Sequence, residues 1–180
     1  TAFGVSDDMN ILINSHFFHP SVGGVETMAE GLAVEWQSKG HDVRVITATS
    51  LNGQDEIPYL DVCRRPSFGE YLRLLRWAKV CFRNGHALRS LPGPVLTGTP
   101  FVTRNARPLS ASHLGPVRRV VDKMTTFFGQ NVGTSTPVAD SIPGPTVQIP
   151  NPARSIFEGD GHPDNQREGL LFAGRLVSRK

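Results

Sequence analysis

Apolar residues occur along this chain in two patterns, as short uninterrupted runs and at helical spacing, and the first fifty residues show both. An uninterrupted apolar run, Ile11-Leu12-Ile13, predicts a central parallel strand over residues 9–14 that is buried on both faces. Apolar residues then recur at helical spacing, which predicts a helix over about residues 25–39. A second apolar run predicts a strand over residues 42–48, so this region reads as a βαβ unit. The expected buried stripe of the helix is Val25, Met28, Leu32 and Trp36, with Ala29 and Ala33 beside them.

The remainder of the chain repeats the same alternation in shorter pieces. The patterns predict strands over residues 61–65, 80–84, 101–103 and about 131–134, and an extended segment over 147–150. They predict helices over residues 68–78 and 116–128, a loop over 50–58, and a turn at Leu91-Pro92-Gly93-Pro94. Strands that alternate with helices indicate the α/β class, here a Rossmann-like parallel sheet with helices on both faces.

Composition divides the chain into four segments. Residues 1–8 precede Met9 and are interpreted as a leader or tag-like segment, and residues 9–152 form the main domain. Residues 153–168 are polar, with glycine and proline, which is typical of a linker. Residues 169–180 begin with the apolar run Leu170-Leu171-Phe172-Ala173, which either pairs with the first sheet or is the first strand of a second domain.

Hydrophobic residues make up 38% of the chain and charged residues 19%, as in an ordinary globular protein. No apolar run approaches the ~20 residues that a membrane-spanning helix needs, and the first residues lack the pattern of a signal peptide. A cytoplasmic location is therefore expected. Cys63 and Cys81 have neither metal-type nor redox spacing, and both are expected to be reduced.

Basic residues are concentrated in the middle of the chain. Residues 64–123 contain twelve lysines and arginines against two acids, a local net charge of +10. This segment is either a solvated basic face or a surface for an anionic partner. The membrane-facing candidates are Arg73, Arg76, Trp77 and Lys79. Nucleic acid is not an expected partner, because the segment carries no recognised nucleic-acid-binding motif.

A glycine pair, Gly23-Gly24, stands between the first predicted strand and the first predicted helix. Glycine lets backbone amides approach a ligand closely, and a helix N-terminus favours anionic oxygens; a plain tight turn is the alternative interpretation. Neither GxGxxG nor GxxxxGK[ST] occurs, which argues against hydride transfer and nucleoside triphosphate hydrolysis. Arg175 and Lys180 follow the last predicted strand and have the chemistry to neutralise a diphosphate, although terminal cations are often only solvated.

Several stretches resemble, in order, the retaining GT-B glycosyltransferases of the group 1, or family 4, type. The opening PSVGGVETMAEGLAVEWQSKGHDVRVIT is similar to the start of that family's N-terminal domain. The later matches are VCFRNGHALRSL, GTPFVTRNA, FGQNVGTSTPVADSI, VQIPNP and LLFAGRLVSRK. The resemblance covers about residues 9–180 and implies a GT-B N-terminal domain followed by the first strand of the donor-binding domain.

The resemblance also implies roles for individual residues. Gly23, Gly24, Arg175 and Lys180 match the positions that bind the diphosphate of a nucleotide diphosphate sugar, with no metal and no other cofactor. Attack on the same face of the sugar, with the leaving diphosphate helping to deprotonate the acceptor, needs no side-chain base, so no catalytic residue is assigned. The family's histidine after the fifth strand is replaced here by Arg104 or Asn105, and the family's paired-glutamate motif does not occur in this sequence.

The expected function is therefore transfer of a sugar, of the hexosyltransferase type, to a lipid-linked or saccharide acceptor by the full-length enzyme, at the inner face of the cell membrane. The chain alone is expected to be inactive. The alternative is a non-catalytic fragment that binds an anionic membrane or acceptor. An epimerase-like Rossmann enzyme is disfavoured by the missing glycine fingerprint and the missing Tyr-x-x-x-Lys motif. The acceptor-side candidates are His16, His19, Asn84, Arg104, Asn105 and Arg107, although a loop histidine at such a position is more often simply exposed to solvent.

Overall fold

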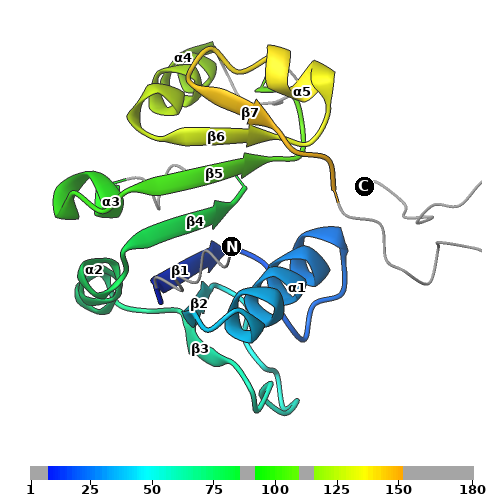
Figure 1. The fold of residues 1–180 in the computed structure, drawn as a ribbon, viewed down its shortest axis with the longest axis vertical. Coiled ribbons are helices and arrows are strands. Elements are labelled where there is room, and N and C mark those ends of the chain that lie inside the picture. The colour runs from blue at the N-terminus through cyan, green and yellow to red at the C-terminus, as the bar shows by residue number, and fades with distance from the viewer. Residues whose placement is uncertain (1–7, 86–91, 110–115, 152–180) are drawn as a thin grey trace, which may run out of the picture. The chain divides into compact units, whose positions relative to one another are not determined.

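Seven parallel strands form a single sheet, in the order β3-β2-β1-β4-β5-β6-β7 (Figure 1). The computed structural model describes residues 8–85, 92–109 and 116–151, and the statements below concern these residues. The strands are β1 (Asn10–Ser15), β2 (Asp42–Thr47), β3 (Asp61–Arg64), β4 (Val80–Asn84), β5 (Phe101–Asn105), β6 (Gln130–Gly133) and β7 (Thr146–Gln148). The predicted Rossmann-like α/β class is confirmed.

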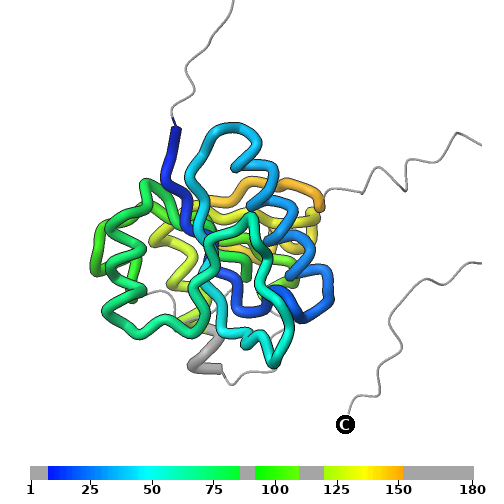
Figure 2. Tube along the Cα trace, turned by 90° about the horizontal axis from the view of Figure 1, so that it is seen from below, coloured from blue at the N-terminus to red at the C-terminus, as the bar shows by residue number. Residues whose placement is uncertain are grey.

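The helices lie on both faces of this sheet. They are α1 (Gly24–Ser38), α2 (Phe68–Trp77), α3 (Pro92–Thr97), α4 (Pro116–Thr125), the 3-10 turn η3 (Thr126–Phe128) and α5 (Thr136–Asp140). The chain moves in one direction across the sheet from β1 to β3 and in the opposite direction from β4 to β7. Right-handed crossovers therefore place α1 on one face and the later helices on the other. Figure 2 shows α1 and α2 on opposite sides of the sheet.

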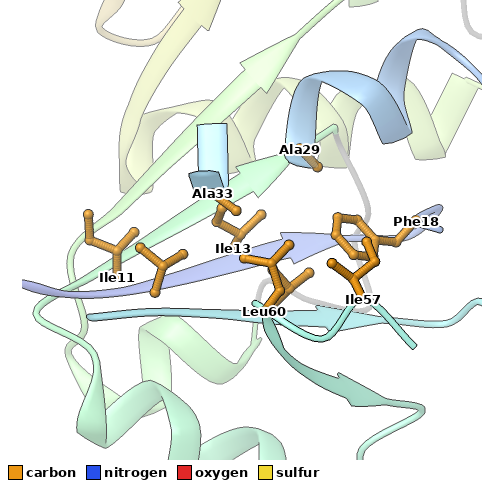
Figure 3. Close-up of a cluster of buried hydrophobic side chains, with 9 residues drawn as sticks. Ile11, Ile13, Phe18, Ala29, Ala33, Ile57 and Leu60 are labelled. Atoms are coloured by element: carbon orange, nitrogen blue, oxygen red, sulfur yellow. The ribbon is translucent and has the colours of Figure 1, made fainter. Parts of the chain in front are cut away.

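The face under α1 contains the larger apolar cluster (Figure 3). Ile11 and Ile13 of β1 point to this side and pack with Ala29 and Ala33 of α1 and with Phe18. The two alanines are fully buried, because a small side chain lets the helix axis approach the sheet. The prediction that the larger residues of this helix form its buried stripe is wrong, because Val25, Met28, Leu32 and Trp36 are only half-buried.

The opposite face is covered by α2. Ser67 caps this helix through a capping box with Glu70, which satisfies two free backbone amides at the helix start. Tyr71, Leu74 and Leu75 are buried against the sheet, as the sequence predicts. Exposed Arg73 and Arg76 lie on the outer side of the same helix.

Two helices were not expected from the sequence. The predicted turn at Pro92 is the start of α3, because proline is favourable in the first turn of a helix. Gly93 lets α3 approach α2 closely: a Cβ on Gly93 would lie 2.4 Å from Cε1 of Tyr71. Helix α5, with proline in its first turn, follows the strand predicted over about residues 131–134, where no helix was predicted.

Strand β5 runs two residues further than predicted, to Asn105. Arg104 was expected in a loop but belongs to this strand and is buried, since its backbone pairs with both β4 and β6. Cys63 and Cys81 are free thiols, as predicted. None of the helices within the described ranges is long and apolar enough to cross a membrane. The predicted linker 153–168 and the strand predicted after it lie outside the described residues.

Candidate functional site

All seven strands are parallel, so their carboxyl ends lie along one edge of the sheet. The chain changes its direction across the sheet between β1 and β4, and this neighbouring pair is the topological switch point. Loops diverge to opposite faces at such a point, which leaves a crevice where open α/β sheets bind ligands. Ser15 ends β1 and Asn84 ends β4, and both are buried.

Asn84 connects three elements at this switch point. Its amide Nδ2 donates to the carbonyl of Val25 in α1 at 2.8 Å and to the hydroxyl of Ser15 at 3.3 Å. Its Oδ1 accepts a hydrogen bond from Nη1 of Arg104 at 2.9 Å. Two of the predicted acceptor-side residues, Asn84 and Arg104, are therefore in direct contact.

Arg104 also lines a cavity of ≈ 140 Å³ on the α1 face. Arg104 is 5% exposed as a residue, and burial lowers the pKa of its guanidinium from the ordinary arginine value. Apart from this cation the cavity wall is apolar. Its other lining residues are Met28, Leu32, Trp36, Phe82, Val132, Ile149 and Pro150.

The other predicted residues of β5 and its loop are placed differently. Successive strand residues point to opposite faces, so the side chain of Asn105 lies on the α2 face and donates to the carbonyl of Thr103 at 3.3 Å. Arg107 is exposed in the loop after β5. These two residues therefore do not join the contact between Asn84 and Arg104.

The glycine pair lies where the sequence predicts it, at the start of α1. Gly23 is extended (φ −178°) and precedes the helix, and its carbonyl accepts from the amide of Thr27 at 3.0 Å. No atom lies within 4 Å of where a Cβ on Gly24 would stand, so the outer side of this residue is open. Nothing in the described part of the chain therefore covers the Cβ side of Gly24.

An acidic side chain, Glu26, folds back over this helix start. Its Oε2 lies 2.6 Å from where a Cβ on Gly23 would stand, so only glycine permits this approach. The hydroxyl of Ser21 donates to Oε1 of Glu26 at 2.8 Å. The protein's own carboxylate thus lies near the positive end of the α1 dipole. The negative charge of Glu26 would repel an incoming anion.

The two loop histidines separate in space. His16 is exposed and lines a cavity of ≈ 290 Å³ beside the carboxyl ends of β1 and β2. His19 instead contacts the loop before β3, with Nε2 3.2 Å from the carbonyl of Asp55, and it does not line this cavity. The remaining lining residues are Phe17, Ser21, Ala48, Thr49, Ser50, Asn52 and Arg65.

Several polar residues at this edge were missed by the sequence analysis. Arg65 reaches the larger cavity from the residue after β3 and has φ 47°, in the left-handed region that arginine seldom adopts. Its Nε donates to the carbonyl of Ala48 at 3.1 Å. Arg83 is buried on the α2 face, where Nη1 donates to the hydroxyl of Thr103 at 3.3 Å and burial lowers its pKa. The only sequence signal for either residue was its position at the end of a predicted strand.

The end of α2 and the residues just after it lie at the other edge of the sheet. The helix ends just before β4 begins, so Trp77 and Lys79 lie at the amino edge of the sheet. Trp77 is half-buried, and the guanidinium carbon of Arg44 lies 4.2 Å from the centre of its ring. Arg175 and Lys180, the expected diphosphate ligands, lie outside the described residues.

Comparison with known proteins finds similarity in structure only. No protein-family model matches the chain, and no curated protein matches it. A similar solved structure is Alr3699/HepE of Anabaena in complex with UDP and glucose, with a TM-score of 0.61 and 17% identity over 79% of this chain. The same protein in complex with UDP gives a TM-score of 0.60 and 14% identity. This chain spans 44% of the length of that protein. At this level of identity the similarity establishes a shared Rossmann-like α/β fold.

Proposed function

We propose that this chain is the acceptor-side domain of a GT-B glycosyltransferase that transfers a sugar from a nucleotide diphosphate sugar. The observation that carries this proposal is the glycine pair at the topological switch point, with open space beside Gly24. It occurs in a fold that resembles a protein solved with UDP and glucose. An anionic donor at the carboxyl edge of a parallel sheet agrees with the general rule for ligands of open α/β sheets.

The donor diphosphate is proposed to lie across the start of α1. The backbone of Gly23 and Gly24 would face its oxygens, with the helix N-terminus adding favourable electrostatics. Arg175 and Lys180 are proposed as the cations that neutralise the phosphates, an assignment that rests on their resemblance to the family motif. Glu26 must turn away as the donor enters, because its carboxylate repels the phosphate charge.

The acceptor is proposed to occupy the larger cavity beside His16 and Arg65. The hydroxyl-bearing residues that line this cavity, Ser21, Thr49 and Ser50, are suited to a saccharide or to the polar head of a lipid-linked acceptor. The contact between Asn84 and Arg104 holds β4, β5 and α1 together beneath this edge. Retention of configuration is proposed to follow from attack on the same face as the leaving diphosphate, which itself takes the acceptor proton. A hexosyl donor fits the family resemblance.

Calorimetric titration of the full chain with UDP-glucose, UDP and glucose tests the donor proposal. UDP-glucose and UDP are expected to bind, and glucose alone is not. Gly24→Val fills the open space beside the helix start and is expected to abolish binding, while Arg175→Ala weakens it about tenfold or more. Gly31→Ala, in the middle of α1, is the matched control and leaves binding unchanged. Absence of nucleotide binding, or equal binding by Gly24→Val, would contradict the proposal.

A second candidate function is a binding module for an anionic surface without chemistry. Exposed Arg73 and Arg76 on the outer side of α2 favour it. Sedimentation with anionic but not neutral vesicles, lost in the double variant Arg73→Glu with Arg76→Glu, together with no nucleotide binding, is the result that selects this alternative.

A further inference from the structure

The larger cavity, beside the carboxyl ends of β1 and β2, combines hydrogen-bonding groups with an exposed aromatic ring. Three hydroxyl-bearing residues and the amide of Asn52 line it. Phe17 also lines it and is 52% exposed, and its ring stands at 84° to the ring of His16 with 4.7 Å between their centres. A sugar ring carries hydroxyls around its rim and C–H groups on its faces, so this lining provides both kinds of contact that it needs.

The charge in this cavity is positive, although the surrounding sequence is acidic. Residues 1–63 contain nine acids and two bases. The eight described residues that line the cavity nevertheless include Arg65 and no carboxylate. Arg65 is exposed, and within the described ranges it forms no ion pair. Its guanidinium, which stays charged at any working pH, is therefore available to an anionic ligand.

Two residues that line the cavity have an unusual backbone conformation. Asn52 and Arg65 have φ angles of 51° and 47°, and they are the two non-glycine residues with positive φ in the described part of the chain. Such conformations tend to be kept where a ligand is bound. Two hydrogen bonds hold Arg65 in place, since its amide donates to the carbonyl of Thr47 at 2.7 Å and its Nε to that of Ala48 at 3.1 Å.

The neighbouring Arg64 joins the two loops that form the cavity wall. Its Nη1 donates to the carbonyl of His19 in the first loop at 2.8 Å and to that of Thr49 in the second at 2.9 Å. Its Nε and Nη2 donate to the two carboxylate oxygens of Glu56 at 2.7 and 2.6 Å. The amide of Phe18 adds a bond to the hydroxyl of Thr49 at 3.2 Å. The wall is thus ordered before a ligand arrives, which lowers the cost of binding.

We propose that this cavity binds a pyranose that carries a phosphate or carboxylate group, and that Arg65 selects the anionic group. The inference rests on the proposed function, in which this sugar is the acceptor. The face of the ring would lie on Phe17 and its hydroxyls would meet the polar lining. The planar guanidinium matches either anionic group with two parallel hydrogen bonds. A volume of ≈ 290 Å³ is at the small end for ligand sites, which favours a monosaccharide over a chain.

Titration calorimetry of the full chain with glucose 6-phosphate, glucuronate and glucose tests this proposal. At least one anionic sugar is expected to bind about tenfold more tightly than glucose, with a margin that shrinks at high salt. The tighter of the two identifies the group as phosphate or carboxylate.

Substitutions assign this preference to named residues. Arg65→Asn removes the charge but keeps a residue that tolerates left-handed φ, and it is expected to lower the affinity for the anionic sugar to about that for glucose. Arg65→Lys restores part of the preference. Phe17→Ala weakens binding severalfold and leaves the preference intact. Lys39→Asn, which removes a charge just after α1, is the matched control and keeps full binding.

Three results would overturn the proposal. These are equal affinity for glucose and both anionic sugars, undiminished binding by Arg65→Asn, and displacement of glucose 6-phosphate by saturating UDP. The last result would place the phosphate at the start of α1 instead of in the cavity.

The same titrations separate this inference from the donor proposal. A preference that depends on Arg65, without binding of UDP, would contradict the donor proposal alone. Binding of UDP without that preference would contradict this inference alone. Far-ultraviolet circular dichroism of each variant establishes that it is folded.

Discussion

Replacement of Asn84 by alanine tests the polar contact that joins β1, β4, β5 and α1. The substitution removes the donor to Val25 and Ser15 and the acceptor for Arg104 at a buried position. When one partner of a buried hydrogen bond is removed, the other polar group stays buried without a partner and out of reach of water. The loss of stability is therefore larger than the net contribution of the hydrogen bond itself. A large loss of stability is therefore expected.

The distances give the expected size of this loss. The bond from Arg104 involves a charged donor at 2.9 Å and is worth about 2 kcal/mol. The bond to Val25 at 2.8 Å contributes about 1 kcal/mol, and the longer one to Ser15 at 3.3 Å about 0.5 kcal/mol. Asn84→Ala should therefore lower the free energy of unfolding by about 3–4 kcal/mol, a large part of the ~5–15 kcal/mol typical of a domain.

Urea unfolding followed by circular dichroism measures this free energy. Gln54→Ala is the matched control, because Gln54 is an exposed loop residue, and it should change the free energy by less than about 0.5 kcal/mol. Arg104→Met, alone and combined with Asn84→Ala, completes a double-mutant cycle. The coupling energy between the two positions should be about 1.5–3 kcal/mol.

A small effect would refute this reasoning. If Asn84→Ala costs less than about 1 kcal/mol, the contact to Arg104 does not contribute in solution as the geometry requires. Additive losses in the cycle would show instead that Asn84 and Arg104 act independently. An unchanged m-value is required for either conclusion, since a changed m-value signals an altered denatured or native state.

Further predictions concern packing, thiol protection and pH. Gly133→Ala should destabilise the chain by several kcal/mol in urea unfolding, because its Cβ would lie 2.7 Å from the backbone of α5; Gly31→Ala, with open space in α1, should stabilise it by about 0.5–1 kcal/mol. Cys81, whose pKa burial raises to about 12, should not react with a thiol reagent at pH 8 until the protein unfolds. Hydrogen bonding from Arg64 lowers the pKa of Glu56, so this pair stabilises the fold above the ordinary carboxyl pKa and less as pH falls through the lowered value. Glu56→Gln should therefore cost about 0.5–1 kcal/mol at pH 7, a difference that shrinks towards pH 3.

Local pattern was enough to predict the strands and most helices. The apolar run in β1 and the helical spacing in α1 are short-range signals, and both elements lie within one or two residues of their predicted bounds. The glycine pair was likewise predicted at the correct turn. The change from an uninterrupted apolar run to helical spacing of apolar residues marks where the strand ends and the helix begins. Helix α3 was missed because its Pro92-Gly93-Pro94 start reads as a turn, and its close packing on Tyr71 of α2 is a tertiary contact that local pattern does not encode.

The sequence by itself determined the alternation of strands and helices, the Rossmann-like class and the position of the glycine turn. Tertiary structure decided which residues meet. Asn84 and Arg104 are twenty residues apart and touch only because β4 and β5 are neighbours in register. The separation of His16 from His19 likewise depends on contacts with distant loops. Val120, Met124 and Phe127 of α4 and η3 face outward, although a surface helix ordinarily buries its apolar side. Hydrogen bonds to Thr126 from the amide of Gly144 and from Asn131 accompany this orientation, and local pattern does not encode these contacts.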